Sequence, residues 1–368
     1  MKNLERRLKI HIKAPMHSFK AGAHIGFENT LARELSMLGI GECEIQSGTV
    51  HFKAKLESVW QTITISRCAR SFEMKIAQFR CENFGRLEHE IKNIDWELYL
   101  PQNCKVNIKA YSEKSRLYHK GAVEERILKC LENKTGNAEH EAKLHVYLKN
   151  DVCSIWLDLC GEALHRRGAR WVDDAPMQET LAASILLCAD FAKYEKLIDP
   201  MAGSGVFSLE AAKWRSNSKL ELMRSFDFME MPAFRKAAFN NFLQKAKQPF
   251  ALRENETYEI LCSDKSEKAV KIILHNANNM PISITKADFF SLPPAQNALL
   301  VLNPPYGKRL GKEKNLYREI AKKIEKDFSK CAYAIICPFA ETEKVMNRHV
   351  NEIQTYNGGL KVMVQMRQ

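Results

Sequence analysis

The second half of the chain alternates short apolar runs with amphipathic segments, and this alternation restricts the fold more than any other feature. Strands are predicted at 196–199, 258–263, 282–286, 298–302 and 332–337, and helices at 176–192, 204–214, 266–279, 317–327 and 340–350. Strands that alternate with helices favour a mostly parallel sheet covered on both faces. The final runs, 351–355 and 360–365 around Asn357, Gly358 and Gly359, predict a β-hairpin. The predicted fold class is therefore α/β.

The first 165 residues show a different pattern, in which short strand and helix signals are interspersed. A helical pattern runs through Leu31, Leu35 and Leu38, while the segment 67–76 fits either a strand or a helix. Strands are predicted at 49–53, 63–65, 105–111, 143–149 and 152–159, and helices at 84–94 and 122–131. The region is therefore predicted to be a small α+β unit.

Length and composition limit the class of protein. At 368 residues the chain should form two or three domains. A net charge of +12 favours binding to an acidic partner, and nucleic acid is the commonest such partner. Solubility alone could also explain the charge.

The eleven cysteines include no C-x-x-C pair, which argues against a disulfide scaffold and a structural zinc site. The charged amino terminus is unlike a signal peptide, and no apolar stretch reaches membrane-spanning length. We expect a reduced, cytoplasmic monomer that binds neither metal nor membrane.

A glycine-containing loop follows the first strand of the second half. After Asp199 and Pro200 come Ala202, Gly203 and Gly205, and then a helix. The glycines allow a ligand to approach the backbone, and the helix amino terminus favours a carboxylate. A lone G-x-G also occurs in nucleotide-binding loops and in ordinary tight turns, but the P-loop pattern for phosphate transfer is absent.

Polar residues close the neighbouring strands. Asp264 ends the next strand, where an acid can accept both ribose hydroxyls, and Asp288 is placed to accept from an adenine amino group. Either acid alone could be a helix cap or a turn residue. Together with Asp199 and Asn303, however, they would lie at one edge of the same sheet, which predicts a cofactor site there.

The tetrapeptide Asn303, Pro304, Pro305 and Tyr306 follows the apolar run 298–302. The Asn303 side chain and the Pro304 carbonyl can accept hydrogen bonds from an exocyclic amine, the prolines stiffen the turn, and the Tyr306 ring can stack on a planar group. The tetrapeptide therefore indicates methylation of a planar nitrogen; the alternative is a proline-rich strand exit.

With these residues, the chain resembles the THUMP-domain guanine-N2 methyltransferases of ribosomal and transfer RNA. Segment 21–53 is similar to their ferredoxin-like leader and 94–126 to the THUMP core. The motifs are Leu-His-Arg-Arg-Gly at 164–168, Ala-Pro-Met-Gln-Glu-Thr-Leu-Ala-Ala at 175–183, Asp-Pro-Met-Ala-Gly-Ser-Gly at 199–205 and Asn-Pro-Pro-Tyr-Gly-Lys-Arg-Leu-Gly at 303–311. Ala202 departs from the family, whose members often have Cys there.

The resemblance implies a class I (Rossmann-like) methyltransferase domain at 166–368, a ferredoxin-like region at 1–55 and a THUMP RNA-binding domain at 56–165. The implied cofactor is S-adenosylmethionine, with Thr180 added to the cofactor residues named above and Asn303 shared between cofactor and catalysis. The implied product is N2-methylguanosine, in 23S rRNA first and tRNA second.

Basic and aromatic residues that could hold the RNA gather in the second half of the first region, at the junction after it and beyond the tetrapeptide. They are Lys109, Arg116, His119, Lys120, His165, Arg166, Arg167, Arg170 and Arg309. For any one of them a solvated surface position is the default interpretation. The clustered residues 165–170 fall at a predicted hinge, where their charges could face phosphates.

Three alternatives stay open. Adenine N6 in DNA and a glutamine side chain in protein would also fit the tetrapeptide. A non-catalytic RNA-binding or ribosome-assembly protein with a silent methyltransferase fold is the third, and the intact polar residues at the strand ends argue against it.

Overall fold

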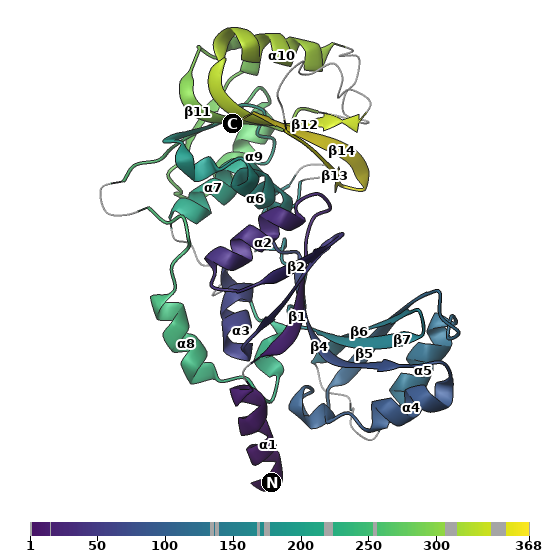
Figure 1. The fold of residues 1–368 in the computed structure, drawn as a ribbon. Coiled ribbons are helices and arrows are strands. Elements are labelled where there is room, and N and C mark those ends of the chain that lie inside the picture. The colour runs from purple at the N-terminus through teal and green to yellow at the C-terminus, as the bar shows by residue number, and fades with distance from the viewer. Residues whose placement is uncertain are drawn as a thin grey trace.

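Two seven-stranded sheets organise the part of the chain that the computed structural model describes (Figure 1). That part comprises residues 2–14, 16–132, 136, 140–167, 170–172, 177–216, 224–252, 256–305, 315–339 and 351–367. One sheet belongs to the first 165 residues and the other to the rest. Among the described residues, no helix is both long enough and apolar enough to cross a membrane.

The second sheet has the strand order β10-β9-β8-β11-β12-β14-β13. The pairs β10–β9, β9–β8, β8–β11 and β11–β12 are parallel, and β14 is antiparallel to both β12 and β13. The predicted parallel sheet with a closing hairpin is thus confirmed. The strands are β8 (Lys196–Asp199), β9 (Glu259–Asp264), β10 (Ser283–Lys286), β11 (Gln296–Leu302), β12 (Lys330–Pro338), β13 (Asn351–Asn357) and β14 (Leu360–Arg367).

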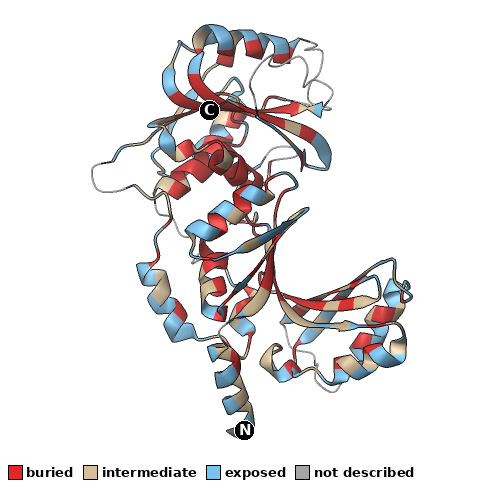
Figure 2. Ribbon diagram, viewed as in Figure 1, coloured by how far each residue is buried: buried red, intermediate tan, exposed pale blue. Residues whose placement is uncertain are grey.

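Helices cover this sheet because its central strands are apolar on both sides. Ala298 to Leu302 of β11 are all fully buried, as a strand between two helical layers must be (Figure 2). The helices of the second half are α6 (Glu179–Cys188), α7 (Val206–Arg215), α8 (Lys236–Lys245), α9 (Glu267–Ala277) and α10 (Leu316–Asp327), with short 3-10 turns η2 (Phe191–Lys193), η3 (Asp227–Glu230) and η4 (Phe289–Ser291). Helix α8 lies away from this sheet, against α3 (Leu56–Ile65) of the first region (Figure 1). The predicted helix at 340–350 lies outside the described residues.

The first sheet has the order β2-β3-β1-β4-β7-β6-β5 and runs without interruption through the first region. Strand β4 pairs with β1 on one side and with β7 on the other. The strands are β1 (His17–Gly22), β2 (Cys43–Gln46), β3 (Thr49–Ala54), β4 (Ser71–Arg80), β5 (Lys105–Glu113), β6 (Glu141–Lys149) and β7 (Val152–Asp158). The helices are α1 (Lys2–Lys13), α2 (Glu28–Met37), α3 (Leu56–Ile65), α4 (Phe84–Lys92) and α5 (Lys120–Leu131), with η1 at Trp96–Leu98.

The predicted strand at 63–65 is wrong, because these residues end helix α3. Leu56, Val59, Trp60 and Ile63 recur at helical spacing and are all buried. The Trp60 ring stacks on Phe228 at a centroid distance of 5.9 Å, so α3 packs against the segment between α7 and β9. That contact joins parts of the chain that are far apart in sequence, and a local pattern cannot reveal it.

Candidate active site

The carboxyl ends of β8, β9 and β11 bring the predicted polar residues to one edge of the second sheet. Asp199 is the last residue of β8, Asp264 is the last residue of β9, and Asn303 directly follows β11. Asp288 lies two residues beyond β10. In an open parallel sheet this edge binds ligands, and the order of strands reverses here between β8 and β11.

The loop between β8 and α7 has an exposed backbone held in a fixed shape. Gly203 and Gly205 have φ angles of +57° and +79°, which side-chain-bearing residues rarely adopt. A Cβ on Gly205 would lie 3.2 Å from Ile273, whereas nothing lies within 4 Å of the equivalent position on Gly203. Gly205 closes the turn onto the Ala202 carbonyl and precedes the first residue of α7. The loop therefore leaves open space above Gly203 beside a helix amino terminus, which suits an anionic group.

Asp264 ties this loop to the next strand. One carboxylate oxygen accepts the Gly203 amide at 2.9 Å and the other accepts the Ser266 amide at 2.8 Å. Each oxygen keeps a further lone pair for a ligand hydroxyl. Asp288, by contrast, caps η4, because one of its carboxylate oxygens accepts the Phe290 amide at 2.8 Å. This is the capping role given above as the alternative to cofactor binding.

Asp199 is buried and anchors the start of α7. Its Oδ2 accepts the Ser208 hydroxyl at 2.8 Å, while Oδ1 has no hydrogen-bond partner among the described residues. Burial raises the pKa of Asp199 to about 7, against the opposing effect of the Ser208 hydrogen bonds. Pro200, which follows it, is also buried.

This pKa gives a pH-dependent stability. The unfolded carboxyl loses its proton near pH 3.8 and the folded one only near 7, so folding stability should fall by about 4 kcal/mol as pH rises between these values and then level off. The Asp199→Asn variant should lose this component. Urea unfolding of both proteins at several pH values measures the difference, and parallel stability curves would contradict the assignment.

Asn303 presents an unused acceptor at the end of β11. Its Oδ1 is buried and has no partner among the described residues, although buried amide oxygens are normally hydrogen-bonded. Pro304 is buried and Pro305 is half-buried. An orphaned acceptor at the ligand-binding edge fits the predicted recognition of an amine. Tyr306 and Arg309 lie outside the described residues.

Thr180 makes a contact that the sequence did not suggest. Its hydroxyl is hydrogen-bonded to His24 Nε2 at 2.8 Å, which joins α6 to the loop after β1. Burial lowers the pKa of His24 to about 3, so the ring is neutral at physiological pH. Thr180 itself is fully buried, and its hydroxyl is thus engaged between the two regions of the chain.

Arg167 does not face solvent, and its predicted RNA contact is wrong. The guanidinium is buried, pairs with Glu210 of α7, and donates to the carbonyls of Leu164 and Arg67. Glu210 also pairs with the fully buried Arg67 at 3.1 Å. Arg167 therefore belongs to an ion-pair network that joins the first region to α7. No local sequence pattern marks this network, because each partner alone looks like a surface charge.

The other predicted RNA residues divide by exposure. Lys109, His119, Lys120 and Arg166 are exposed, and His165 is half-buried. Arg116 is exposed but pairs with Glu82 at 2.6 Å, and Arg170 pairs with Glu179 with little of its side chain accessible. These residues lie on different elements: Lys109 lies on β5, and His119 and Lys120 lie at the start of α5, whereas His165, Arg166 and Arg170 line a hollow together with Met177 and Glu179.

Asn276 of α9 is a further residue that sequence reasoning missed. Its side-chain amide donates to the Trp171 and Ser204 carbonyls at 2.9 and 3.2 Å, and its Oδ1 accepts the Trp171 amide at 2.8 Å. It thereby fastens the segment before α6 to the glycine loop. Nothing in the helical pattern of α9 marks this asparagine.

Comparison with known families agrees with this geometry. A family model described as "RMKL-like, methyltransferase domain" matches residues 167–364, more than half of the chain. The chain belongs to this family. A second model, the "RlmL ferredoxin-like domain", matches residues 18–70. The family and the class I architecture expected from the sequence are confirmed.

Individual relatives carry related names. The chain is 27% identical over 369 residues to ribosomal RNA large subunit methyltransferase K/L of Shewanella baltica, covering 94% of this chain and 52% of that protein. The enzyme of the same name from Syntrophotalea carbinolica is 29% identical over 380 residues, covering 95% and 53%. The chain thus spans about half the length of these curated relatives.

A solved structure extends the comparison. The methyltransferase SMU.472, crystallised with SAH, is 26% identical, has a TM-score of 0.85, and covers 96% of this chain and 98% of its own. The likeness therefore includes both sheets.

Proposed function

We propose that this protein transfers a methyl group from S-adenosylmethionine to N2 of a guanosine in RNA, with 23S rRNA as its first substrate and tRNA as the alternative. The observation that supports it most is the buried, unpartnered Oδ1 of Asn303 at the ligand-binding edge of a methyltransferase-family sheet. The names of the relatives and the SAH bound to the similar structure support the rRNA and the cofactor. A cytoplasmic location follows from an rRNA substrate.

The described residues fit S-adenosylmethionine. The open space above Gly203 and the amino terminus of α7 would receive its carboxylate, and Asp264 would accept its ribose hydroxyls. Asp288, whose second oxygen is not used by the η4 cap, would accept the adenine amine. Ala202 and Pro200 would contact the cofactor through the backbone. When bound, the sulfonium supplies the methyl group.

In this proposal the chain positions the acceptor nitrogen and needs no strong base. The Asn303 Oδ1 and the Pro304 carbonyl would accept the two N–H groups of the guanine amine and aim its lone pair at the methyl group. Hydrogen bonds to the amine become stronger as it gains positive charge, so they stabilise the transition state. Pro305 would hold the turn, and Tyr306 would stack on the flipped-out base.

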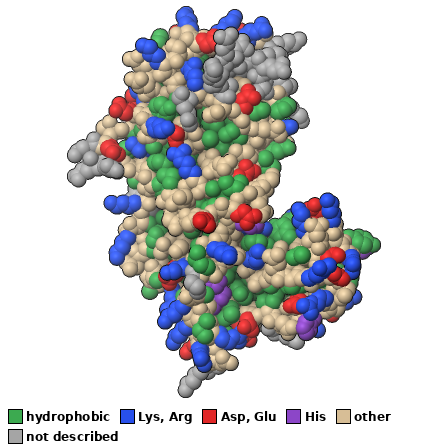
Figure 3. Space-filling model, in the orientation of Figure 1, with side chains coloured by type: hydrophobic (Ala, Val, Ile, Leu, Met, Phe, Trp, Pro, Cys, Tyr) green, Lys and Arg blue, Asp and Glu red, His purple; other side chains and the backbone are tan. Residues whose placement is uncertain are grey.

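The first sheet supports RNA binding by the first region. The Lys20 ammonium lies 3.8 Å from the Tyr147 ring centroid, but Lys20 is buried and paired with Glu73 at 3.0 Å, so it supports the Tyr147 ring from within the fold. Tyr147 stacks on Tyr111 at 4.9 Å, and the exposed Lys109 lies beside that ring. Figure 3 shows histidine, basic and acidic side chains around the concave angle between the two lobes. Aromatic rings interleaved with cations suit single-stranded nucleic acid.

The proposed domains are a ferredoxin-like region at 1–55, a THUMP domain at 56–165 and a methyltransferase domain at 166–368. The ferredoxin-like family model reaches residue 70, and β4 pairs with strands on both sides, so the first two regions share one sheet. No group of His, Cys, Asp or Glu that could hold a metal ion occurs among the described residues, and the proposed mechanism uses none.

The test is methylation in vitro with labelled S-adenosylmethionine. Protein-free 23S rRNA, tRNA and a DNA duplex serve as separate substrates, and nucleoside mass spectrometry identifies the product. N2-methylguanosine in the rRNA supports the proposal, and in tRNA alone it selects the alternative. N6-methyladenine in the DNA, or cofactor binding without methylation of any substrate, would contradict it.

A further inference from the structure

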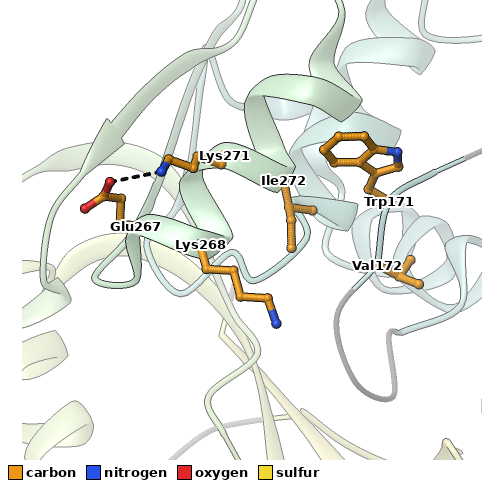
Figure 4. A pocket seen from close by; sticks show the side chains of 6 residues that line it. All are labelled: Trp171, Val172, Glu267, Lys268, Lys271 and Ile272. Carbon is orange, nitrogen blue, oxygen red and sulfur yellow. Dashed lines mark ion pairs between the residues drawn. The ribbon is translucent and has the colours of Figure 1, made fainter.

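A hollow of about 620 Å³ lies between helix α9 and the segment before α6 (Figure 4). Trp171, Val172 and Ile272 form an apolar part of its wall, and Lys268 of α9 supplies a cation, whereas the neighbouring Lys271 points toward Glu267. Glu267 also lines it, but its carboxylate is paired with Lys271 at 3.2 Å and with Lys286 at 3.5 Å. The hollow thus combines a flat apolar surface with positive charge, and it contains none of the residues assigned to the cofactor.

Trp171 is held in place although it is exposed. Its ring stacks on His275 with centroids 3.6 Å apart and an interplanar angle of 15°. Its backbone amide and carbonyl are both bonded to the Asn276 side chain. Yet 56% of the residue is accessible to solvent. An exposed indole that is already ordered can stack on a ligand without losing further side-chain conformational entropy on binding.

The position of the hollow connects it to the proposed reaction. Asn276 bonds to the Ser204 carbonyl within the glycine loop as well as to the Trp171 backbone, so one side chain joins the residue that carries the indole to the cofactor loop. A group stacked on Trp171 would lie beside the catalytic edge and would not enter it. The chemistry of the wall selects a planar aromatic body that carries a negative charge.

We propose that this hollow binds a nucleotide of the substrate RNA outside the target guanosine. Its base stacks on the face of Trp171 that is turned away from His275, and its phosphate is held by Lys268. The inference rests on the proposed function for the identity of the RNA. A stack on a tryptophan tolerates any base, so the site holds the strand without selecting its sequence.

The distribution of tryptophans provides a direct probe. The other four, Trp60, Trp96, Trp156 and Trp214, are at most 4% exposed, so an aqueous quencher reaches mainly Trp171. Titrating the full chain with protein-free 23S rRNA in the presence of SAH should quench part of the tryptophan emission. The emission that remains should be less sensitive to quenching by iodide than it is without RNA. Unchanged emission and unchanged iodide access at saturating RNA would overturn the proposal.

Variants give a second, independent measurement. Trp171→Ala should weaken RNA binding by about 10-fold, the loss expected for one stacked base, and Trp171→Phe should restore most of it. The control Leu274→Ala truncates another exposed apolar side chain of α9 and should have no effect. SAH affinity and melting temperature should stay unchanged, which excludes misfolding. Wild-type RNA affinity in Trp171→Ala would refute the site.

Two outcomes separate this inference from the proposed function. Quenching by RNA without methylation of any guanosine would support the hollow and contradict the reaction. Methylation of a guanosine with no change in Trp171 emission would support the reaction and contradict the hollow. Equal quenching by free GMP at the same nucleotide concentration would show a mononucleotide site and overturn the assignment to RNA.

Discussion

Replacing Asn303 with alanine should abolish methyl transfer, with a fall in kcat of about 1,000-fold, while S-adenosylmethionine still binds. The variant removes one of two acceptors that aim the guanine amine, and misplaced or unstabilised groups at a reacting centre cost factors of this size. The orphaned Oδ1 has no partner among the described residues, so its loss should not destabilise the fold.

Single-turnover methylation and calorimetric titration of the cofactor measure the two halves of this prediction. Gln296→Ala is the matched control, because it removes an exposed amide at the opposite end of the same strand, β11. Its rate should equal that of the wild type. If Asn303→Ala kept a rate within 10-fold of the wild type, the tetrapeptide would not be the catalytic device.

Replacing Glu210 with alanine should lower the free energy of unfolding by about 3–5 kcal/mol. Glu210 is fully inaccessible and pairs with Arg67 and Arg167, both buried. Removing the carboxylate would leave two guanidinium groups without their counter-charge in a medium that solvates them poorly. The effect should therefore be far larger than the loss of an ordinary ion pair.

Glu259→Ala is the matched control. Its partner, Lys196, lies 2.7 Å away, but both side chains are partly exposed, so the pair should contribute less than about 1 kcal/mol. Urea unfolding at pH 7 compares the two variants with the wild type. Equal destabilisation by both would mean that the network at Glu210 does not hold the two regions together.

The methyltransferase domain was predictable because its central strands, β8, β11 and β12, are buried apolar runs. Each strand from β8 to β14 begins and ends within two residues of its predicted range. In the central strands, apolar residues such as Leu299 and Val301 must be buried, and that requirement sets where the strand lies. The polar strand ends followed from the topology alone. The predicted edge for Asp199, Asp264 and Asn303 therefore agreed with the structure.

What could not be predicted depends on partners that are distant in sequence. The isoleucines Ile63 and Ile65 fit a short strand in their local pattern. They belong to helix α3, whose Trp60 ring stacks on Phe228, far away in the sequence. Arg67, Glu210 and Asn276 look like surface residues in their local patterns, and only tertiary contacts make them structural. The short alternation of the first region also left β1 and β2 unrecognised, because few apolar residues mark them.

The unbroken first sheet has a consequence for how a substrate would be chosen. Strand β4 is hydrogen-bonded to β1 and to β7, so the two halves of the sheet cannot rotate against each other without breaking a ladder. Glu210 and the His24–Thr180 bond fix that sheet to the elements that carry the cofactor loop. An RNA held on the sheet would thus meet the methyl donor at a constant offset. The protein would thus select its target by a fixed distance from the bound RNA segment. An insertion or deletion in the RNA between that segment and the target should move the modification to the guanosine that then lies at this distance.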